Sequence, residues 1–188
     1  MYFWTAPEGT FTIEAFKHLP LEGRRWELLD STVVRMEDHG LRTSALTASL
    51  LAKTGRQVKE DEIGMILGPG CGFQLWPRHE TVRVTDISFT STARLPPKRF
   101  WNDYPRQAPD LIVEIFSPFE RFITAMDHIV MFLQAGTREA WFVDPQRETV
   151  MIFRPDDAPE LLRKRDTLDG GDLLPGFSIP VAEIFTEE

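Results

Sequence analysis

Two stretches of the chain are apolar at almost every position, which is the pattern of strands buried on both faces of a sheet. One covers residues 111–116 and is interrupted only by Glu114; the other covers residues 140–143. Apolar residues at helical spacing lie between them, over about 121–135, and Gly136 marks the end of that helix. This strand–helix–strand order predicts two parallel strands joined by a right-handed crossover.

Shorter patterns predict the remaining elements. A helix is expected from its N-cap Thr12 to Pro20, and a second helix over about 43–58. Strands are predicted over 26–29, 32–36, 63–67, 73–76, 81–90 and 149–154, followed by short strands and loops to residue 185. Several of these strands are separated by tight turns, such as Asp30-Ser31. We therefore expect an α/β fold, a mixed β-sheet flanked by helices, in a single domain spanning 1–188 with its core at about 10–185.

Composition limits the class of protein. The 188 residues are enough for one domain, and the 42% hydrophobic and 27% charged residues are typical of globular proteins. No apolar run reaches the roughly 20 residues that a membrane span needs. The lone Cys71 excludes an internal disulfide, and residues 1–4 do not resemble a leader. These features predict a cytoplasmic protein without a membrane anchor.

The formal net charge of −8 argues against a protein that coats nucleic acid, because phosphate binding requires Lys and Arg. It does not exclude a local basic patch, and carboxylates that hold metal ions add to the negative count. The four histidines show no metal-ligand spacing and are expected to be ordinary surface or core residues. Trp101 and Trp141 are expected to fill the core.

Three acidic residues lie in apolar surroundings and are the candidates for chemistry. Glu114 interrupts the predicted central strand, Asp86 lies within the predicted strand 81–90, and Glu27 lies within 26–29. A buried carboxylate needs a cation or hydrogen bonds, and two carboxylates on neighbouring strands can share Mg²⁺. Exposed edges or pairing with Arg25 or Arg83 would explain the same pattern. The residues alone leave a nuclease, a phosphatase and a structural salt bridge open.

A series of short motifs runs through residues 10–185. The strongest motif is Ala108-Pro109-Asp110-Leu111-Ile112-Val113-Glu114-Ile115-Phe116-Ser117-Pro118. The others are Arg25-Trp26-Glu27-Leu28-Leu29-Asp30, His39-Gly40, Cys71-Gly72-Phe73-Gln74-Leu75, Val82-Arg83-Val84-Thr85-Asp86-Ile87, Ala135-Gly136, Trp141-Phe142-Val143-Asp144-Pro145 and Leu174-Pro175-Gly176-Phe177. No single motif is specific, but their order and spacing together are. They resemble the restriction endonuclease family of uncharacterised bacterial proteins within the PD-(D/E)XK nuclease superfamily.

The resemblance implies a restriction-endonuclease-like fold in which Asp86 and Glu114 bind the catalytic metal, Mg²⁺ or Mn²⁺, and Glu27 is an additional carboxylate near it. The family's catalytic lysine has moved onto the helix after the second acid, and its position here is His128. Thr85 replaces a proline and Ser31 replaces a turn glycine of the family pattern; both are expected to be tolerated. The histidine bears on chemistry, because its ordinary pKa is about 6.5 and a lysine is a permanent cation near neutral pH.

The function implied by the resemblance is Mg²⁺-dependent endonucleolytic hydrolysis of DNA, with Asp86, Glu114, His128 and Glu27 as catalytic residues. Duplex cutting in this superfamily usually uses two active sites, so a homodimer is expected. The basic residues expected to contact the DNA backbone are Arg24, Arg25, Arg83, Lys98, Arg99 and Arg121. Two alternatives stay open: an inactive nuclease fold that binds protein or nucleic acid, and a hydrolase of a phosphate that is not nucleic acid.

Overall fold

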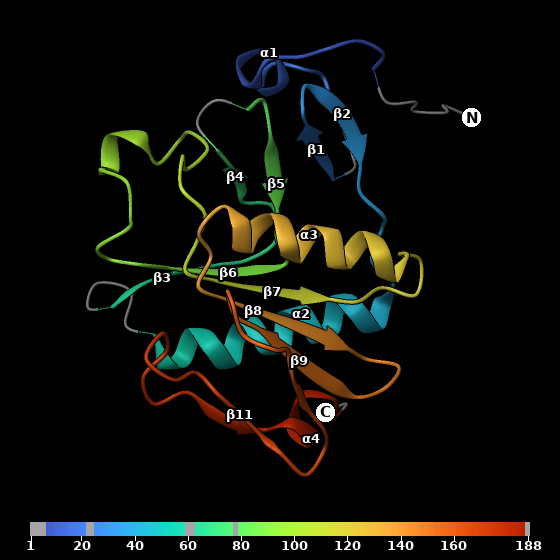
Figure 1. Cartoon of the computed structure of the whole chain (residues 1–188), viewed down its shortest axis with the longest axis vertical. Helices are drawn as coiled ribbons and strands as arrows, with labels where there is room; N and C mark the ends of the chain where they lie inside the picture. The colour runs from blue at the N-terminus through green and yellow to red at the C-terminus, as the bar shows by residue number, and fades with distance from the viewer. Residues whose placement is uncertain (1–6, 22–24, 59–62, 77–78, 187–188) are drawn as a thin grey trace.

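The computed structural model describes residues 7–21, 25–58, 63–76 and 79–186. A six-stranded sheet with the order β10-β9-β8-β7-β6-β3 crosses the middle of the molecule (Figure 1). Its strands are β3 (Gly64–Leu67), β6 (Ile87–Ser91), β7 (Leu111–Ile115), β8 (Glu139–Asp144), β9 (Thr149–Phe153) and β10 (Glu160–Leu162). β7 and β8 run parallel, whereas the other neighbours in this sheet are antiparallel. The predicted mixed sheet is confirmed.

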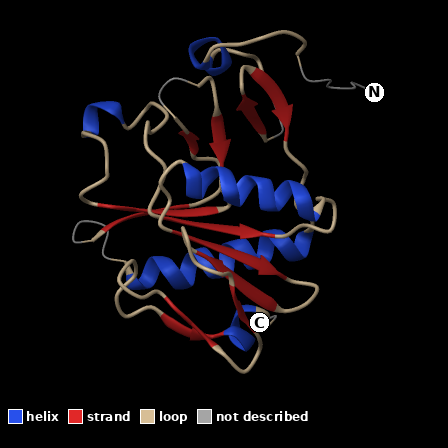
Figure 2. Ribbon diagram, in the orientation of Figure 1, coloured by secondary structure: helices blue, strands red, loops and turns tan. Residues whose placement is uncertain are grey.

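Two long helices cover opposite faces of this sheet (Figure 2): α2 (Leu41–Gln57) and α3 (Phe122–Gln134). The alternation of side chains along β7 divides the core between them. Leu111, Val113 and Ile115 pack in the cluster that contains residues of α2, and Ile112 packs in the cluster that contains residues of α3. Glu114 has the parity of Ile112 and therefore faces α3.

A second, four-stranded sheet has the order β2-β1-β5-β4 and is covered by the short helix α1 (Ile13–Lys17), which Thr12 caps as predicted. Its strands are β1 (Trp26–Leu29), β2 (Thr32–Arg35), β4 (Gly72–Gln74) and β5 (Val82–Val84). β1 and β2 form a hairpin through Asp30 and Ser31, whose φ angles are 44° and 67°. A two-residue turn of this hand favours glycine, so Ser31 holds a conformation that costs it energy.

The predicted single strand over 81–90 is wrong. The chain forms β5 in one sheet and β6 in the other, and it changes sheet at Thr85 and Asp86. The sequence pattern did not reveal the break because the residues on both sides of it are buried. Asp86 therefore lies at a corner between two sheets rather than within a strand. Residues 77 and 78 of the predicted preceding loop lie outside the described residues.

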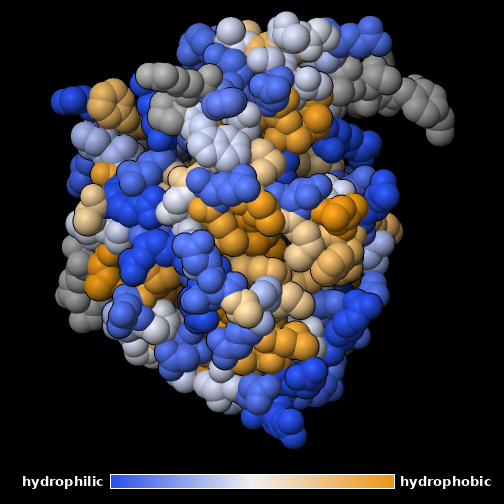
Figure 3. Space-filling model, viewed as in Figure 1, coloured by the Kyte–Doolittle hydropathy of each residue, from blue (hydrophilic) through white to orange (hydrophobic). Residues whose placement is uncertain are grey.

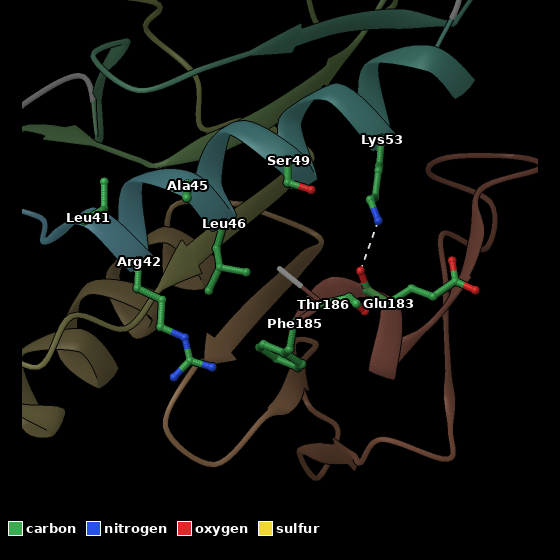
Figure 4. A pocket seen from close by; sticks show the side chains of 9 residues that line it. All are labelled: Leu41, Arg42, Ala45, Leu46, Ser49, Lys53, Glu183, Phe185 and Thr186. Carbon is green, nitrogen blue, oxygen red and sulfur yellow. Dashed lines mark hydrogen bonds between the residues drawn. The ribbon is translucent and has the colours of Figure 1, made fainter. Parts of the chain in front are cut away.

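The C-terminal segment adds a two-stranded sheet, β11 (Thr167–Asp169) and β12 (Ser178–Pro180), and the short helix α4 (Val181–Ile184) where strands and loops were predicted. Lys53 Nζ on α2 donates a hydrogen bond of 3.0 Å to the carbonyl oxygen of Glu183, beside a hollow of about 580 Å³ (Figure 4). This contact places α4 beside α2.

The long loop between β6 and β7 contains one 3₁₀ turn, η1 (Lys98–Phe100). Trp141 is fully buried, as predicted, but Trp101 directly after η1 is 46% exposed, so its predicted place in the core is wrong. The residues around Trp101 are polar and rich in proline, and they pack few apolar side chains against the ring. No helix in the described part of the chain is long and apolar enough to span a membrane.

Candidate active site

The four residues singled out from the sequence line one pocket of about 310 Å³ between the small sheet and α3. Glu27 comes from β1, Asp86 from the corner after β5, Glu114 from β7 and His128 from α3. Other titratable or polar residues of the lining are Arg25, Arg35, Glu37, His39, Arg83, Ser117, Glu120, Arg121 and Thr124. None of the four predicted residues lines the larger hollow between α2 and α4. Elements distant in sequence thus bring the predicted residues together.

Asp86 is almost completely buried and is held at both carboxylate oxygens. Its Oδ2 accepts a 2.9 Å hydrogen bond from the backbone N–H of Ile115, one residue after Glu114. Its Oδ1 lies 3.1 Å from Arg25 Nη2 and 3.5 Å from His39 Nε2, but it accepts no hydrogen bond within the described structure. The Arg25 contact is therefore an ion pair without hydrogen-bond alignment, and Oδ1 keeps its lone pairs free for another partner.

Glu114 points into the same pocket from the face of β7 that α3 covers. Its Oε1 is buried without a hydrogen-bond partner in the described residues, and the nearest cationic candidate is His128 Nε2 at 3.8 Å. Burial raises the pKa of Glu114 well above 4.5, and the Asp86 carboxylate raises it further, against the opposing effect of Arg25. A cation placed between Asp86 and Glu114 would oppose both effects and lower the pKa of Glu114.

His128 lies on the buried face of α3, and its ring stacks on Phe132 with the centroids 5.1 Å apart. Burial lowers the pKa of His128 well below 6.5, and the positive charges of Arg83 and Arg25 lower it further. The imidazole is therefore neutral near pH 7. Its Nε2 is buried without a hydrogen-bond partner among the described residues, so the pocket contains a neutral nitrogen at the position where the resemblance predicts the family's lysine.

Glu27 has a different environment from the other two acids. Its Oε1 accepts a 2.7 Å hydrogen bond from the backbone N–H of Val84, and its Oε2 lies 3.0 Å from Arg83 Nη1. Burial raises the pKa of Glu27, and Arg83 opposes that shift. Because both oxygens already have partners, Glu27 ties β1 to β5 and positions Arg83.

Three residues of the pocket were not recognised as site residues from the sequence. Glu120 lies in the loop before α3, where burial and then the Asp86 carboxylate raise its pKa to about 7. Arg25 Nη1 donates a 2.9 Å hydrogen bond to His39 Nε2, and burial lowers the pKa of His39. Arg25 had been expected at the DNA backbone or as an ion-pair partner of the acids. Glu120 and His39 occur in polar segments, where no apolar run makes a charged residue conspicuous.

The arrangement of the carboxylates limits what kind of metal could bind. In the described residues, no group of three or more His, Cys, Asp and Glu side chains has the arrangement of a metal site. A fully protein-ligated centre, such as structural zinc, does not fit this pocket. Mg²⁺ is usually held by one or two carboxylates and keeps several waters. Asp86 Oδ1 and Glu114 Oε1, which accept no hydrogen bond in the described residues, fit that smaller requirement.

Comparison with known proteins identifies the family. A protein-family model described as "Uma2: Putative restriction endonuclease" matches residues 13–182, nearly the whole chain. The chain belongs to the Uma2 family. Among solved structures, this Uma2 protein is similar to the crystal structure of a putative nuclease belonging to DUF820 from Anabaena variabilis. The TM-score is 0.80 at 20% identity, and the alignment covers 93% of this chain and 97% of that chain. No curated protein matches.

Membership of the Uma2 family confirms the predicted resemblance, and the structural similarity confirms the restriction-endonuclease-like α/β fold. The basic residues predicted to face DNA are dispersed in this Uma2 chain. Arg25, Arg83 and Arg121 line the pocket, whereas Lys98 and Arg99 lie on η1, outside it. Arg24 lies outside the described residues. Three of the predicted cations therefore line the site, and two of them, Arg25 and Arg83, form ion pairs with Asp86 and Glu27.

Proposed function

We propose that this Uma2 chain is a Mg²⁺-dependent endonuclease that hydrolyses DNA phosphodiester bonds at the pocket. The main support is a pair of buried carboxylate oxygens without hydrogen-bond partners in the described structure, Asp86 Oδ1 and Glu114 Oε1, in one cavity of a nuclease fold. Buried carboxylates are costly, by several kcal/mol. The Arg25 ion pair offsets that cost at Asp86, whereas in the described residues only the neutral His128 lies near Glu114 Oε1. A shared divalent cation would stabilise both.

Asp86 and Glu114 would hold the cation, Mg²⁺ or Mn²⁺, and Glu27 would act behind them by fixing Arg83. When bound, the metal would polarise the scissile phosphate and lower the pKa of a coordinated water. Arg25 and Arg83 are permanent cations whose guanidinium groups line the same cavity. They would attract and orient the phosphodiester. In this way they would supply the positive charge that a lysine supplies in the family pattern.

His128 would accept a proton from the attacking water or orient that water. The proposal rests on its neutral ring and on the unpaired Nε2, which lies 3.8 Å from Glu114 Oε1. A general base must be unprotonated at the working pH, and a histidine with a lowered pKa satisfies that condition. Such a histidine is a weaker source of positive charge than a lysine, which assigns electrostatic stabilisation to Arg25 and Arg83.

A homodimer is part of the proposal, because cutting both strands of a duplex usually uses two sites in this superfamily. Apolar side chains gather in the middle of the face shown in Figure 3, where α3 lies. The exposed apolar residues of α3 and the turn before it are Phe119, Phe122, Ile123 and Val130. An apolar surface of this kind supports contact with a second copy.

A non-catalytic module that binds protein or nucleic acid is the second candidate, and two observations favour it. The lysine position holds the neutral His128, and Arg25 already forms an ion pair with Asp86 Oδ1. In such a module, Arg25 would replace the metal as the partner of the carboxylates. The two candidates differ in whether a divalent cation changes the behaviour of the protein.

Cleavage of supercoiled plasmid DNA in Mg²⁺ or Mn²⁺ tests the proposal directly. Wild type should nick or linearise the plasmid, and Glu114→Gln, which keeps the shape of the side chain, should lower the rate by at least about 100-fold because one metal ligand loses its charge. His128→Lys should retain or raise activity. Asp127→Asn, which changes an exposed acid on the same helix, is the matched control and should cleave like wild type.

The outcomes separate the two candidates. If wild type does not cleave plasmid but His128→Lys does, the metal site is intact and His128 fails to replace the lysine. If neither protein cleaves plasmid with Mg²⁺ or Mn²⁺ between pH 6 and 9, the nuclease is excluded and the binding module is favoured. Hydrolysis of a small phosphodiester, bis-p-nitrophenyl phosphate, without cleavage of plasmid would redirect the assignment to a phosphate that is not nucleic acid.

A further inference from the structure

The loop between β6 and β7 carries a concentration of positive charge on an acidic protein. Residues 92–109 contain four cationic residues, Arg94, Lys98, Arg99 and Arg106, against the single acid Asp103, whereas the whole chain has a net charge of −8. Two of these cations stand beside two aromatic residues at the tip of the loop, which we call the basic-aromatic tip: Lys98, Arg99, Phe100 and Trp101. The tip projects from the side of the molecule as the short yellow-green helical turn at the upper left of Figure 1.

All four side chains of the tip are exposed to solvent. Phe100 is 48% and Trp101 46% exposed, a large area for aromatic residues that cover no part of the core. Lys98 and Arg99 form no ion pair with any residue that the structure describes, and the only acid nearby in sequence, Asp103, pairs with Lys17 instead. The positive charge of the tip is therefore available to a partner.

The tip is ordered before any partner arrives. Trp101 Nε1 donates a 3.0 Å hydrogen bond to the carbonyl oxygen of Pro96, which fixes the indole ring. Lys98 Nζ lies 5.5 Å from the centroid of the Trp101 ring, and Arg99 Cζ lies 4.8 Å from that of Phe100. At the base of the loop, Arg94 Nη1 lies 3.1 Å from Asp110 Oδ1 and anchors the loop to the start of β7. A rigid aromatic group loses little conformational entropy when it binds.

This combination matches the chemistry of an unpaired nucleic-acid strand. Bases without a pairing partner stack on exposed aromatic rings, and Lys and Arg beside the rings contact the phosphates. A closed duplex offers its phosphates but hides the faces of its bases, so it would use only half of the tip. We propose that the basic-aromatic tip is a second nucleic-acid contact, separate from the pocket, that binds a single-stranded segment through Phe100 and Trp101. The choice of nucleic acid as the ligand rests on the proposed function, whereas the geometry of the tip is observed independently of it.

Fluorescence anisotropy of a labelled dT12 oligonucleotide, measured with the full chain in EDTA, tests this inference without any cleavage. Phe100→Ala with Trp101→Ala should weaken binding by about 25-fold or more, since stacking on each aromatic ring is worth at least about a fivefold change in Kd. Trp101→Phe should retain most of the affinity. Arg165→Ala, which removes an exposed arginine elsewhere, is the matched control and should change Kd by less than about twofold.

A salt titration supplies the second measurement. Lys98→Ala with Arg99→Ala should reduce the slope of log Kd against log salt concentration by about 1.4, because each phosphate contact to a single strand contributes about 0.7. A 12-base-pair duplex should respond to the charge variants but only weakly to the aromatic ones. Equal losses for both nucleic acids on removal of the rings would contradict stacking.

Other results would overturn the inference independently of catalysis. They are absence of dT12 binding by wild type, unchanged binding by the aromatic variant, or tip-dependent binding to phosphatidylserine vesicles with none to dT12. If the protein cleaves plasmid but gives one of these results, single-strand binding by the tip is refuted and the proposed nuclease activity stands. If dT12 binding depends on the tip but the protein does not cleave plasmid, the proposed nuclease activity is refuted and single-strand binding by the tip stands.

Discussion

Glu114 and His128 face each other in the pocket, and burial acts on their charges in opposite directions. It raises the pKa of the carboxyl group and lowers that of the imidazole, so both groups favour their neutral forms while no cation is bound. The neighbouring Asp86 carboxylate adds to the shift of Glu114. The protein therefore keeps an ionisable residue in the pocket at the expense of its own stability, a common property of functional sites.

Removing that charge should stabilise the protein in EDTA. Because the folded-state pKa of Glu114 is raised, its stabilising contribution is complete below the unfolded-state pKa of about 4.5 and is lost as pH rises through the folded-state pKa. Glu114→Gln carries no charge at any pH, so it should raise Tm at pH 7.5. Each kcal/mol gained corresponds to about 2–4 °C in a chain of this size.

Thermal unfolding at pH 7.5 and pH 4 checks the sign of this effect. The gain of Glu114→Gln should disappear at pH 4, where the carboxyl group is protonated in both the folded and unfolded states. Asp127→Asn on the exposed face of α3 should leave Tm within about 1 °C at both pH values. A Glu114→Gln protein that is less stable than wild type at pH 7.5 would mean that the folded protein stabilises the Glu114 charge.

Among single residues, the sequence predicted those charged side chains whose neighbours in the chain are apolar. Glu114 was recognised because its neighbours are strongly apolar, and its burial follows from the strand that carries it. Glu120 and His39 were overlooked because their segments are polar, so nothing local distinguishes them from surface residues. Their presence in the pocket depends on the path of the loops around α3 and β2, which residue patterns do not specify.

Among the elements, α2 and α3 hold the central sheet from its two faces. Leu50 on α2 is almost completely buried in the cluster that contains the β7 residues Leu111 and Val113. Periodicity predicted both helices and the parallel pair β7–β8 because apolar spacing reports directly on packing. It failed at the corner after β5, because strands of two sheets can follow each other with no break in hydrophobicity.

Leu50→Ala should lower the free energy of unfolding by about 2–5 kcal/mol, since it leaves a cavity between α2 and the sheet. Ser49→Ala, its exposed neighbour on the same helix, should change that free energy by less than about 0.5 kcal/mol. Urea denaturation monitored by tryptophan fluorescence measures both. Equal, small effects of the two substitutions would show that α2 does not pack on the sheet as described.

For the molecule as a whole, the proposed cutting of a duplex depends on a surface that brings two sites together. The exposed apolar side chains of α3 lie on the face opposite α2, and Phe119 from the same region also lines the pocket. A dimer formed through this surface would place two pockets near the interface. The sequence predicted the need for a dimer from the resemblance, but it could not predict the surface, because exposed and buried apolar residues look alike in α3.

Sedimentation velocity at 1–50 µM checks this arrangement. Wild type should sediment as a dimer, and Ile123→Glu with Val130→Glu should sediment as a monomer because each copy would place charge in an apolar contact. Leu41→Glu alters a residue that is 90% exposed on α2 and should leave the dimer intact. A monomeric wild type at 50 µM would remove the dimer from the proposal.

The corner at Thr85 and Asp86 has a consequence for how such a protein can change over evolutionary time. Asp86 joins the two sheets and accepts the amide hydrogen of Ile115, so its loss would disturb folding as well as chemistry. Selection for a folded chain alone is enough to retain this acid in a lineage that no longer needs catalysis. Residues that enter from α3 have no such protection, and the resemblance to the family predicts the position of its lysine on that helix, at His128. The presence of an acid at Asp86 therefore indicates the fold, whereas the residue at position 128 on α3 is the better indicator of catalytic activity.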